Sequence, residues 1–200
     1  MGRLLLVLLA AAALLAGCGG SDTAKDPAGQ VPAEGGLRAK VGAAQAVKAA
    51  RAIYGRLLER FGGRPPTPEE ILADDPEALR AAAGFSRAKV AYLRSLAEHV
   101  LEGELELDRL AELPDEDVIR ELTAVKGIGE WTAHMFLMFT LHRPDVLPTG
   151  DLGVRNAIMR AYGLETAPKP AEMQAIAEAW RPYRTRACLY LWRSLDNAPV

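Results

Sequence analysis

The chemically most informative stretch of the sequence is a glycine turn, Lys126-Gly127-Ile128-Gly129, between two segments of helical character. Glycine permits positive φ and lets a phosphate approach the backbone closely. A helix that starts after the turn offers unpaired N–H groups and the positive end of its dipole, and Ile128 can anchor the turn in a core. The turn therefore fits a site that binds the phosphates of a nucleic-acid backbone and does not read the base sequence. The alternative is a plain helix–helix turn, which a Gly-x-Gly pattern alone most often marks.

Asp151 and a group of arginines are the next candidates. Asp151 directly precedes an apolar-periodic segment that begins at Leu152, a position typical of a helix N-cap, and this structural role is compatible with a chemical one. A local basic stretch near the C-terminus could contact phosphates, or it could be a solvated helix end. Its members are Arg181, Arg184, Arg186 and Arg193.

The number and spacing of the cysteines and histidines indicate no metal site, and we expect no cofactor. Cys18 and Cys188 cannot build a four-cysteine zinc site or an iron–sulfur cluster. The three histidines, His99, His134 and His142, do not fall at a metal-ligand spacing with a carboxylate. Cys188 is most simply a buried small hydrophobic residue.

Composition places these residues in one helical globular domain. The chain has 200 residues, half of them hydrophobic, with 24 Lys and Arg against 26 Asp and Glu. The net charge of −2 excludes a strongly basic nucleic-acid clamp and an acidic tail. Apolar residues recur at helical spacing and no alternating strand pattern occurs, so the predicted fold class is all-α.

Capping signals divide this domain into short helices. Gly62-Gly63 ends a first helix with Val47 and Phe61 on its apolar face, and Thr67, Asp75 and Ser86 precede three further helix starts. Pro114-Asp115-Glu116-Asp117 opens another helix. The remaining helices are expected at residues 131–141, 152–162, 171–180 and 182–195.

Three motifs in order resemble the helix-hairpin-helix-GPD superfamily of base-excision DNA glycosylases, and within it the DNA-3-methyladenine glycosylase II family. They are Val125-Lys-Gly-Ile-Gly-Glu-Trp-Thr-Ala, Asp145-Val-Leu-Pro-Thr-Gly-Asp151-Leu-Gly-Val-Arg155, and Trp180-Arg-Pro-Tyr183-Arg-Thr-Arg-Ala-Cys-Leu-Tyr-Leu-Trp192-Arg. The resemblance runs from about Val41 to Trp192 and implies a multi-helix glycosylase-like domain, N-terminally shortened. Upstream, residues 1–36 stand where the family has further helices.

The resemblance implies a function and a site. The family hydrolyses the N-glycosidic bond of a flipped-out damaged base, here an alkylated purine of the 3-methyladenine type in double-stranded DNA. The implied catalytic carboxylate is Asp151, which would stabilise an oxocarbenium-like transition state and steer water. Trp131, Trp192, Tyr183 and Met135 are the implied base pocket, and indole faces suit a cationic base. Lys126, Gly127, Ile128, Gly129 and Arg184 are the implied phosphate contacts.

Two departures from the family pattern bear on activity. Bifunctional relatives carry a Schiff-base lysine where this chain has Trp131, which implies a monofunctional enzyme without lyase chemistry. The family's Gly-Gln-Gln or Gly-Gln-Leu wedge corresponds to Val41-Gly42-Ala43-Ala44-Gln45-Ala46, with a small Ala44 at the wedge position. A small side chain fills little of the gap left by a flipped base.

The N-terminus has the pattern of an export signal. A short apolar run and the ending Leu15-Ala16-Gly17-Cys18 resemble a lipoprotein signal peptide over residues 1–18, with Cys18 as the lipidated residue. Residues 19–36 read as a flexible linker, and residues 37–200 as the glycosylase domain. This predicts a membrane-anchored protein. The alternative is a cytoplasmic or nucleoid protein whose N-terminus is misassigned.

Two functions from different classes follow. The first is a monofunctional glycosylase in base excision repair, with alkylated double-stranded DNA as partner and no protein partner predicted. The second is a lipid-anchored, catalytically impaired helical binding module on the same scaffold. The intact Asp151, hairpin and paired tryptophans favour the first.

Overall fold

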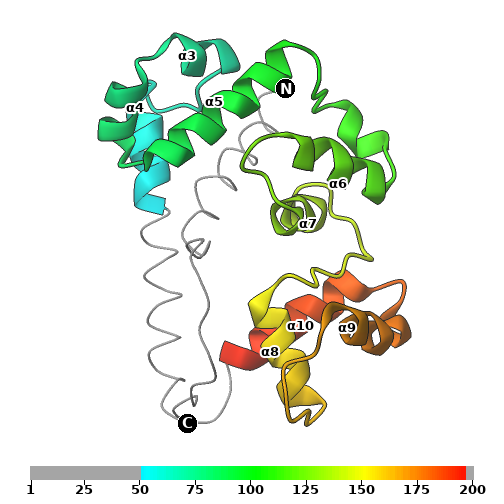
Figure 1. The fold of residues 1–200 in the computed structure, drawn as a ribbon. Coiled ribbons are helices and arrows are strands. Elements are labelled where there is room, and N and C mark those ends of the chain that lie inside the picture. The colour runs from blue at the N-terminus through cyan, green and yellow to red at the C-terminus, as the bar shows by residue number, and fades with distance from the viewer. Residues whose placement is uncertain (1–50, 197–200) are drawn as a thin grey trace.

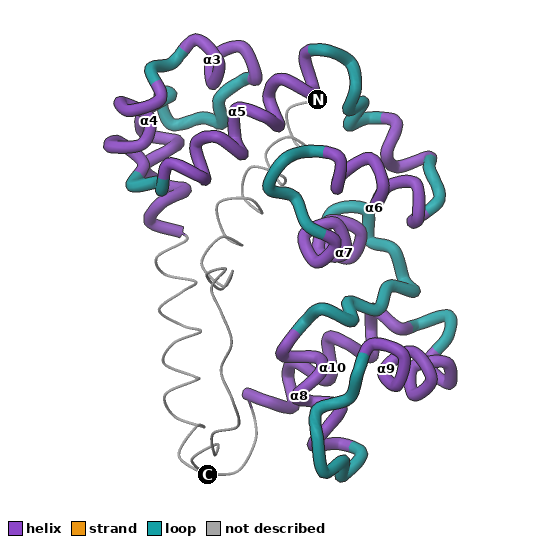
Figure 2. The backbone as a smooth tube through the Cα atoms, in the orientation of Figure 1, coloured by secondary structure: helices purple, strands orange, loops and turns teal. Residues whose placement is uncertain are grey.

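The computed structural model describes residues 51–196, which consist of helices and connecting loops (Figure 1). No strand occurs within that range (Figure 2). The predicted all-α fold class is therefore confirmed for the described part of the chain.

The N-terminal helices pack as one group at the top of Figure 1. Residues 51–60 are helical, and they are followed by α3 (Pro68–Ala73), α4 (Pro76–Ala83) and α5 (Arg87–Leu101). The predicted caps are confirmed. The Glu70, Ala78 and Lys89 amides donate to the side chains of Thr67, Asp75 and Ser86 at 3.3, 2.7 and 3.2 Å. These bonds satisfy amides that the first helical turn leaves free.

The hairpin helices follow α5 through a short 3₁₀ helix, η1 (Arg109–Glu112). They are α6 (Asp115–Ala124) and α7 (Glu130–Phe139), joined by residues 125–129. Residues 132–138 of α7 are all buried. A helix that is apolar nearly all round needs burial on every side, so α7 forms the centre around which the other elements are placed.

The C-terminal helices form the lower group in Figure 1: α8 (Leu152–Ala161), α9 (Pro170–Ala177), the 3₁₀ helix η2 (Glu178–Trp180) and α10 (Arg184–Asp196). Residues 140–151 lead from α7 into α8. α10 packs against α8, which brings the last helix to the start of α8 and so to Asp151.

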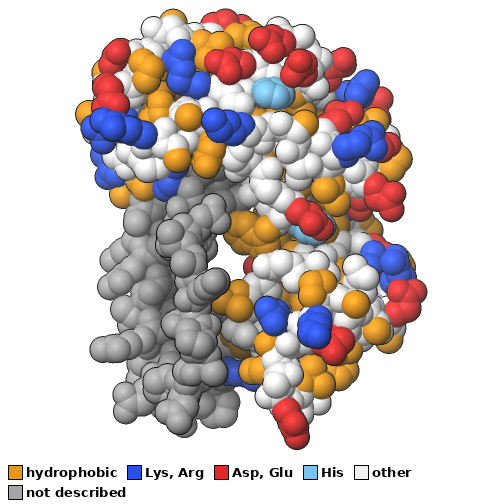
Figure 3. All heavy atoms as spheres, in the orientation of Figure 1, with side chains coloured by type: hydrophobic (Ala, Val, Ile, Leu, Met, Phe, Trp, Pro, Cys, Tyr) orange, Lys and Arg blue, Asp and Glu red, His pale blue; other side chains and the backbone are white. Residues whose placement is uncertain are grey.

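Several predictions fall on residues 1–50, outside the described part. They are the signal peptide with Cys18, the linker at 19–36, the boundary at residue 37 and the wedge stretch Val41–Ala46. Within residues 51–196, no helix combines the length and the apolar character needed to cross a membrane. On the face drawn in Figure 3, acidic and basic side chains are intermingled, in keeping with the small net charge.

Candidate active site and nucleic-acid contact

Asp151 lies at the N-cap of α8, and three N–H groups donate to its carboxylate. Oδ1 accepts from the Val154 amide at 2.6 Å and from the Trp192 indole Nε1 at 2.8 Å. Oδ2 accepts from the Trp131 indole Nε1 at 2.8 Å. The residue is 8% exposed. The predicted cap is confirmed, and the carboxylate is held by hydrogen bonds of the stronger, charge-assisted kind.

The two tryptophans reach Asp151 from different helices, Trp131 from the first turn of α7 and Trp192 from α10. Both are partly buried. The structure shows that their N–H edges bind the Asp151 carboxylate. The role of their ring faces as a wall for a cationic base stays a prediction. The Trp192 ring also stacks on Phe139, with centroids 6.1 Å apart and planes 23° apart. Phe139, which sequence reasoning missed, thus borders the site.

The other two predicted pocket residues lie in different surroundings. Met135 is buried in α7 one turn after Trp131. Tyr183 precedes α10, whereas Trp192 is nine residues further on, about 13 Å along a helix axis. The Tyr183 side chain is 60% exposed. Tyr183 thus lies at the opposite end of α10 from Trp192, and its place in the base pocket stays a prediction.

Arg184 holds the loop that leads to Asp151. Its guanidinium donates to both carboxylate oxygens of Asp145, at 2.6 and 3.0 Å, and Arg181 adds a bond of 2.8 Å to the same carboxylate. Burial raises the pKa of Asp145, but the hydrogen bonds from Arg184 together with the charges of Arg184 and Arg181 outweigh it and hold that pKa below the usual value. The Arg184 guanidinium thus braces the loop through Asp145. Its contact with a DNA phosphate stays a prediction.

Thr185 adds a second tie between this loop and α10. Its hydroxyl donates to the Arg143 carbonyl at 2.7 Å and accepts from the Val146 amide at 3.0 Å. Since α10 also carries Trp192, one helix fixes both the approach to Asp151 and one of its donors. Sequence reasoning missed this role because the bonded residues are about 40 positions apart.

The glycine turn has an inner and an outer side. Gly127 has φ +91°, and a Cβ there would lie 2.1 Å from Cγ of Tyr92 on α5, so both backbone and space require glycine. Ile128 is 7% exposed and anchors the turn as expected. Lys126, Gly127 and Gly129 are exposed, and no side chain caps the N-terminus of α7 at Gly129. The outer side thus presents free amides and a lysine.

Cys188 lies on α10, one turn before Trp192, and is fully buried as expected. Burial raises the pKa of the Cys188 thiol to about 12, and the negative charge of Asp151 acts in the same direction. The thiol is therefore neutral at physiological pH and offers no nucleophile beside the carboxylate.

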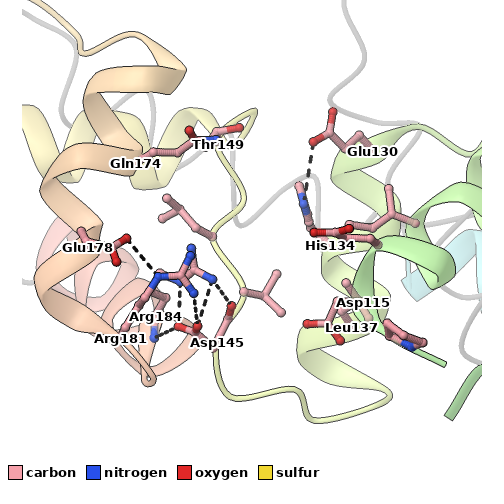
Figure 4. Close-up of a pocket in the computed structure, with 15 residues that line it drawn as sticks. Asp115, Glu130, His134, Leu137, Asp145, Thr149, Gln174, Glu178, Arg181 and Arg184 are labelled. Carbon is pink, nitrogen blue, oxygen red and sulfur yellow. Dashed lines mark hydrogen bonds and ion pairs between the residues drawn. The ribbon is translucent and has the colours of Figure 1, made fainter. Parts of the chain in front are cut away.

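A separate cleft of about 720 Å³ lies between α6–α7 and the C-terminal helices. Figure 4 shows Glu130 and His134 on one wall, and Asp145 with Arg181 and Arg184 on the other. His134 Nδ1 is buried without a hydrogen-bond partner among the described residues. Burial lowers the pKa of His134 below 6.5, against the charges of Glu130 and Asp115. Asp151 does not line this cleft.

The sequence of this chain is similar to those of DNA repair proteins. Residues 41–182 match the model of the HhH-GPD superfamily base excision DNA repair protein. DNA-3-methyladenine glycosylase 1 of Schizosaccharomyces pombe is 41% identical over 149 residues, which cover 74% of this chain and 65% of that relative. The chain spans between 45% and 65% of the length of three curated relatives that it matches.

Solved structures of similar proteins share the fold. A 3-methyladenine DNA glycosylase (Mag1) of Schizosaccharomyces pombe in complex with abasic DNA superposes with a TM-score of 0.72 at 33% identity, over 96% of this chain and 80% of that one. A DNA-3-methyladenine glycosidase of Bacillus halodurans gives a TM-score of 0.67 at 43% identity, over 76% and 69% of the two chains.

Proposed function

Because the chain belongs to the HhH-GPD superfamily of base excision DNA repair proteins, we propose that it is a monofunctional DNA glycosylase that hydrolyses the N-glycosidic bond of alkylated purines of the 3-methyladenine type. The observation that carries the proposal is the Asp151 carboxylate, held by the Val154 amide and by two indole N–H groups. A carboxylate needed only as a helix cap, like Asp75 on α4, has one such donor.

The proposed reaction uses this carboxylate as a fixed negative charge. The damaged nucleotide is flipped out of the duplex, because its glycosidic bond is unreachable in the stack. As the bond to the base breaks, positive charge develops on the sugar, and the Asp151 carboxylate stabilises it in a site of low dielectric. Oδ2 has one N–H donor where Oδ1 has two. We therefore assign Oδ2 to face the sugar and the attacking water.

Hydrolysis without lyase chemistry follows from Trp131. This indole stands where the family resemblance places a lyase lysine, and it donates to Asp151 at 2.8 Å. An indole N–H has no nucleophilic lone pair, so it cannot form a Schiff base with the sugar. Lys126, in the exposed turn, is five residues before this position.

The proposed DNA contact is the outer side of the glycine turn. The exposed Lys126 and the uncapped N-terminus of α7 at Gly129 suit a phosphate. The buried Ile128 and the Tyr92 ring against Gly127 hold the turn in place. Such contacts position the duplex and do not read its sequence.

The test is release of 3-methyladenine from methylated DNA by the purified protein. Asp151→Asn keeps a capping side chain but loses the charge, so release should fall by at least about 100-fold. Asp75→Asn, the same change at the cap of α4, is the matched control and should leave release unchanged. Equal release by Asp151→Asn would remove this carboxylate from the mechanism. DNA binding by the wild-type protein without release would instead favour a scaffold that has lost catalysis.

The absence of lyase chemistry has its own measurement. Borohydride added during the reaction traps a Schiff base as a covalent protein–DNA adduct. We expect no adduct and no strand cleavage beyond that of the abasic product itself. A trapped adduct would contradict the monofunctional assignment and leave the glycosylase assignment intact.

Membrane anchoring through Cys18 stays a proposal from the sequence alone. Palmitate labelling of the full chain in a bacterial host should depend on Cys18 and disappear in Cys18→Ser. Label that persists in this variant would end the lipoprotein assignment and favour a cytoplasmic or nucleoid protein.

A further inference from the structure

We infer that Gly153 is a positioning residue for Asp151: the missing side chain at this position lets the Trp192 indole reach the carboxylate. The inference rests on the proposed glycosylase function and adds to it a residue that does not itself touch the substrate. Gly153 is the second residue of α8, between the Asp151 cap and the Val154 amide that binds it.

Space, and not backbone conformation, calls for glycine here. The backbone of Gly153 is helical and has no positive φ. A Cβ at this position would lie 2.9 Å from Cδ1 and 3.0 Å from Nε1 of Trp192, and 3.0 Å from Oδ1 of Asp151. The methyl group of an alanine would thus contact both ends of the Trp192–Asp151 hydrogen bond.

Neither Trp192 nor Asp151 can move away from a side chain at position 153 without losing other contacts. The Trp192 ring stacks on Phe139 at the end of α7, and α10, which carries Trp192, packs against α8. The Asp151 carboxylate is bound by Val154 and Trp131 as well. An alanine at 153 must therefore lengthen the Trp192 bond or disturb these contacts, because real Cβ atoms do not approach other atoms so closely.

Helix propensity does not explain the glycine at position 153. Apart from proline, glycine is the poorest residue for a helix, and alanine is the best. On local grounds alone, Gly153→Ala should strengthen the first turn of α8. Helix formation therefore does not favour glycine at position 153, whereas the close approach of Trp192 does.

The experiment compares Gly153→Ala with Gly150→Ala, three residues earlier in the chain. A Cβ at Gly150 would meet no atom within 4 Å, and the residue has no positive φ, so this variant is a matched control. We expect the single-turnover rate of base release to fall about 10- to 100-fold in Gly153→Ala, the range for losing one hydrogen bond to a charged group. DNA affinity should stay within about twofold because the hairpin is untouched.

A readout independent of activity is the indole ¹⁵N–¹H NMR signal of Trp192, assigned by its loss in Trp192→Phe. This signal should shift in Gly153→Ala and stay in place in Gly150→Ala. If the wild-type protein releases no base, the proposed function fails, and the indole signal still tests the positioning. An unshifted signal together with a wild-type rate in Gly153→Ala would overturn the inference.

A double-mutant cycle separates positioning from general damage to the fold. In Trp192→Phe, the N–H donor and part of the ring are gone, so adding Gly153→Ala should cost less than about twofold in rate. This holds even where Gly153→Ala alone folds poorly, since the smaller ring relieves the clash. An equal loss in both backgrounds would show that Gly153 does not act through Trp192.

Discussion

The carboxylate and the glycine turn differ in how their polar groups are satisfied. At Asp151, both oxygens are bound within the protein, by donors from α7, α8 and α10. At the turn, the N-terminus of α7 has no side-chain cap, and Lys126 has no acidic partner among the described residues. One site is complete before substrate arrives, whereas the other is left open toward solvent.

The difference fits the two tasks that we propose for these sites. A group that acts on the transition state gains from being fixed beforehand, because no reorganisation is then needed during the reaction. A group that holds a phosphate must exchange water for the ligand, so its donors have to be free. The two sites predict different consequences for similar substitutions.

The largest effect is expected for Gly127→Ala. A Cβ would clash with Tyr92 and the residue has φ +91°, so the free energy of unfolding should fall by about 2–4 kcal/mol. Urea denaturation measures it. Gly129→Ala is the control, since a Cβ there meets nothing within 4 Å. It should leave stability nearly unchanged and weaken DNA binding alone. Equal stability losses would contradict the distinction between inner and outer side.

The next effect concerns Trp131. Trp131→Phe removes the N–H donor to Oδ2, so the rate of base release should fall about 10- to 100-fold with little change in DNA affinity. Single-turnover assays measure the rate. Trp180→Phe is the matched control, because that indole donates to Tyr162 and not to Asp151. A normal rate in Trp131→Phe would mean that the carboxylate needs no donor on Oδ2.

A smaller effect is expected at the open site. Lys126→Ala should weaken DNA binding several-fold. It should also make the slope of log K against log salt concentration shallower by about one, as expected for the loss of one phosphate contact. Titrations at several salt concentrations measure both. Lys169→Ala, before α9, should change neither. A full loss of binding would indicate that Lys126 does more than contact one phosphate.

The smallest effect concerns the cleft and not the two sites. Burial lowers the pKa of His134, so the unfolded chain binds more protons than the folded one below about pH 6.5. The free energy of unfolding should therefore fall as the pH drops through 6.5 toward the lower folded pKa. His134→Leu should weaken this dependence, whereas the exposed His142→Asn should retain it. Urea midpoints at pH 7.5 and 5.5 test the difference.

Local structure was predictable where the signal is local. Thr67, Asp75, Ser86 and Asp151 cap helices as their positions suggest, because a cap needs only the next three residues. The turn around Gly127 was predictable for the same reason, as it lies within a few residues of both helices.

Long-range contacts were not predictable from spacing. Trp131 and Trp192 lie 20 and 41 positions from Asp151, and only the family resemblance joined them. The Arg184–Asp145 ion pair gave no signal because the two residues are 39 positions apart. Gly153 gave no signal at all, since its backbone is ordinary and its neighbour Trp192 is distant in sequence.

The Trp131–Asp151 hydrogen bond joins α7 to the start of α8, whereas Trp192 and Arg184 both lie on α10, which packs against α8. A movement of α7 away from α8 would therefore stretch the bond at Oδ2 and the Trp192–Phe139 stack, whereas the Val154 bond to Oδ1, which lies within α8, would be kept. Oδ2, which we propose faces the sugar, is thus the carboxylate oxygen whose hydrogen bond depends on the position of α7.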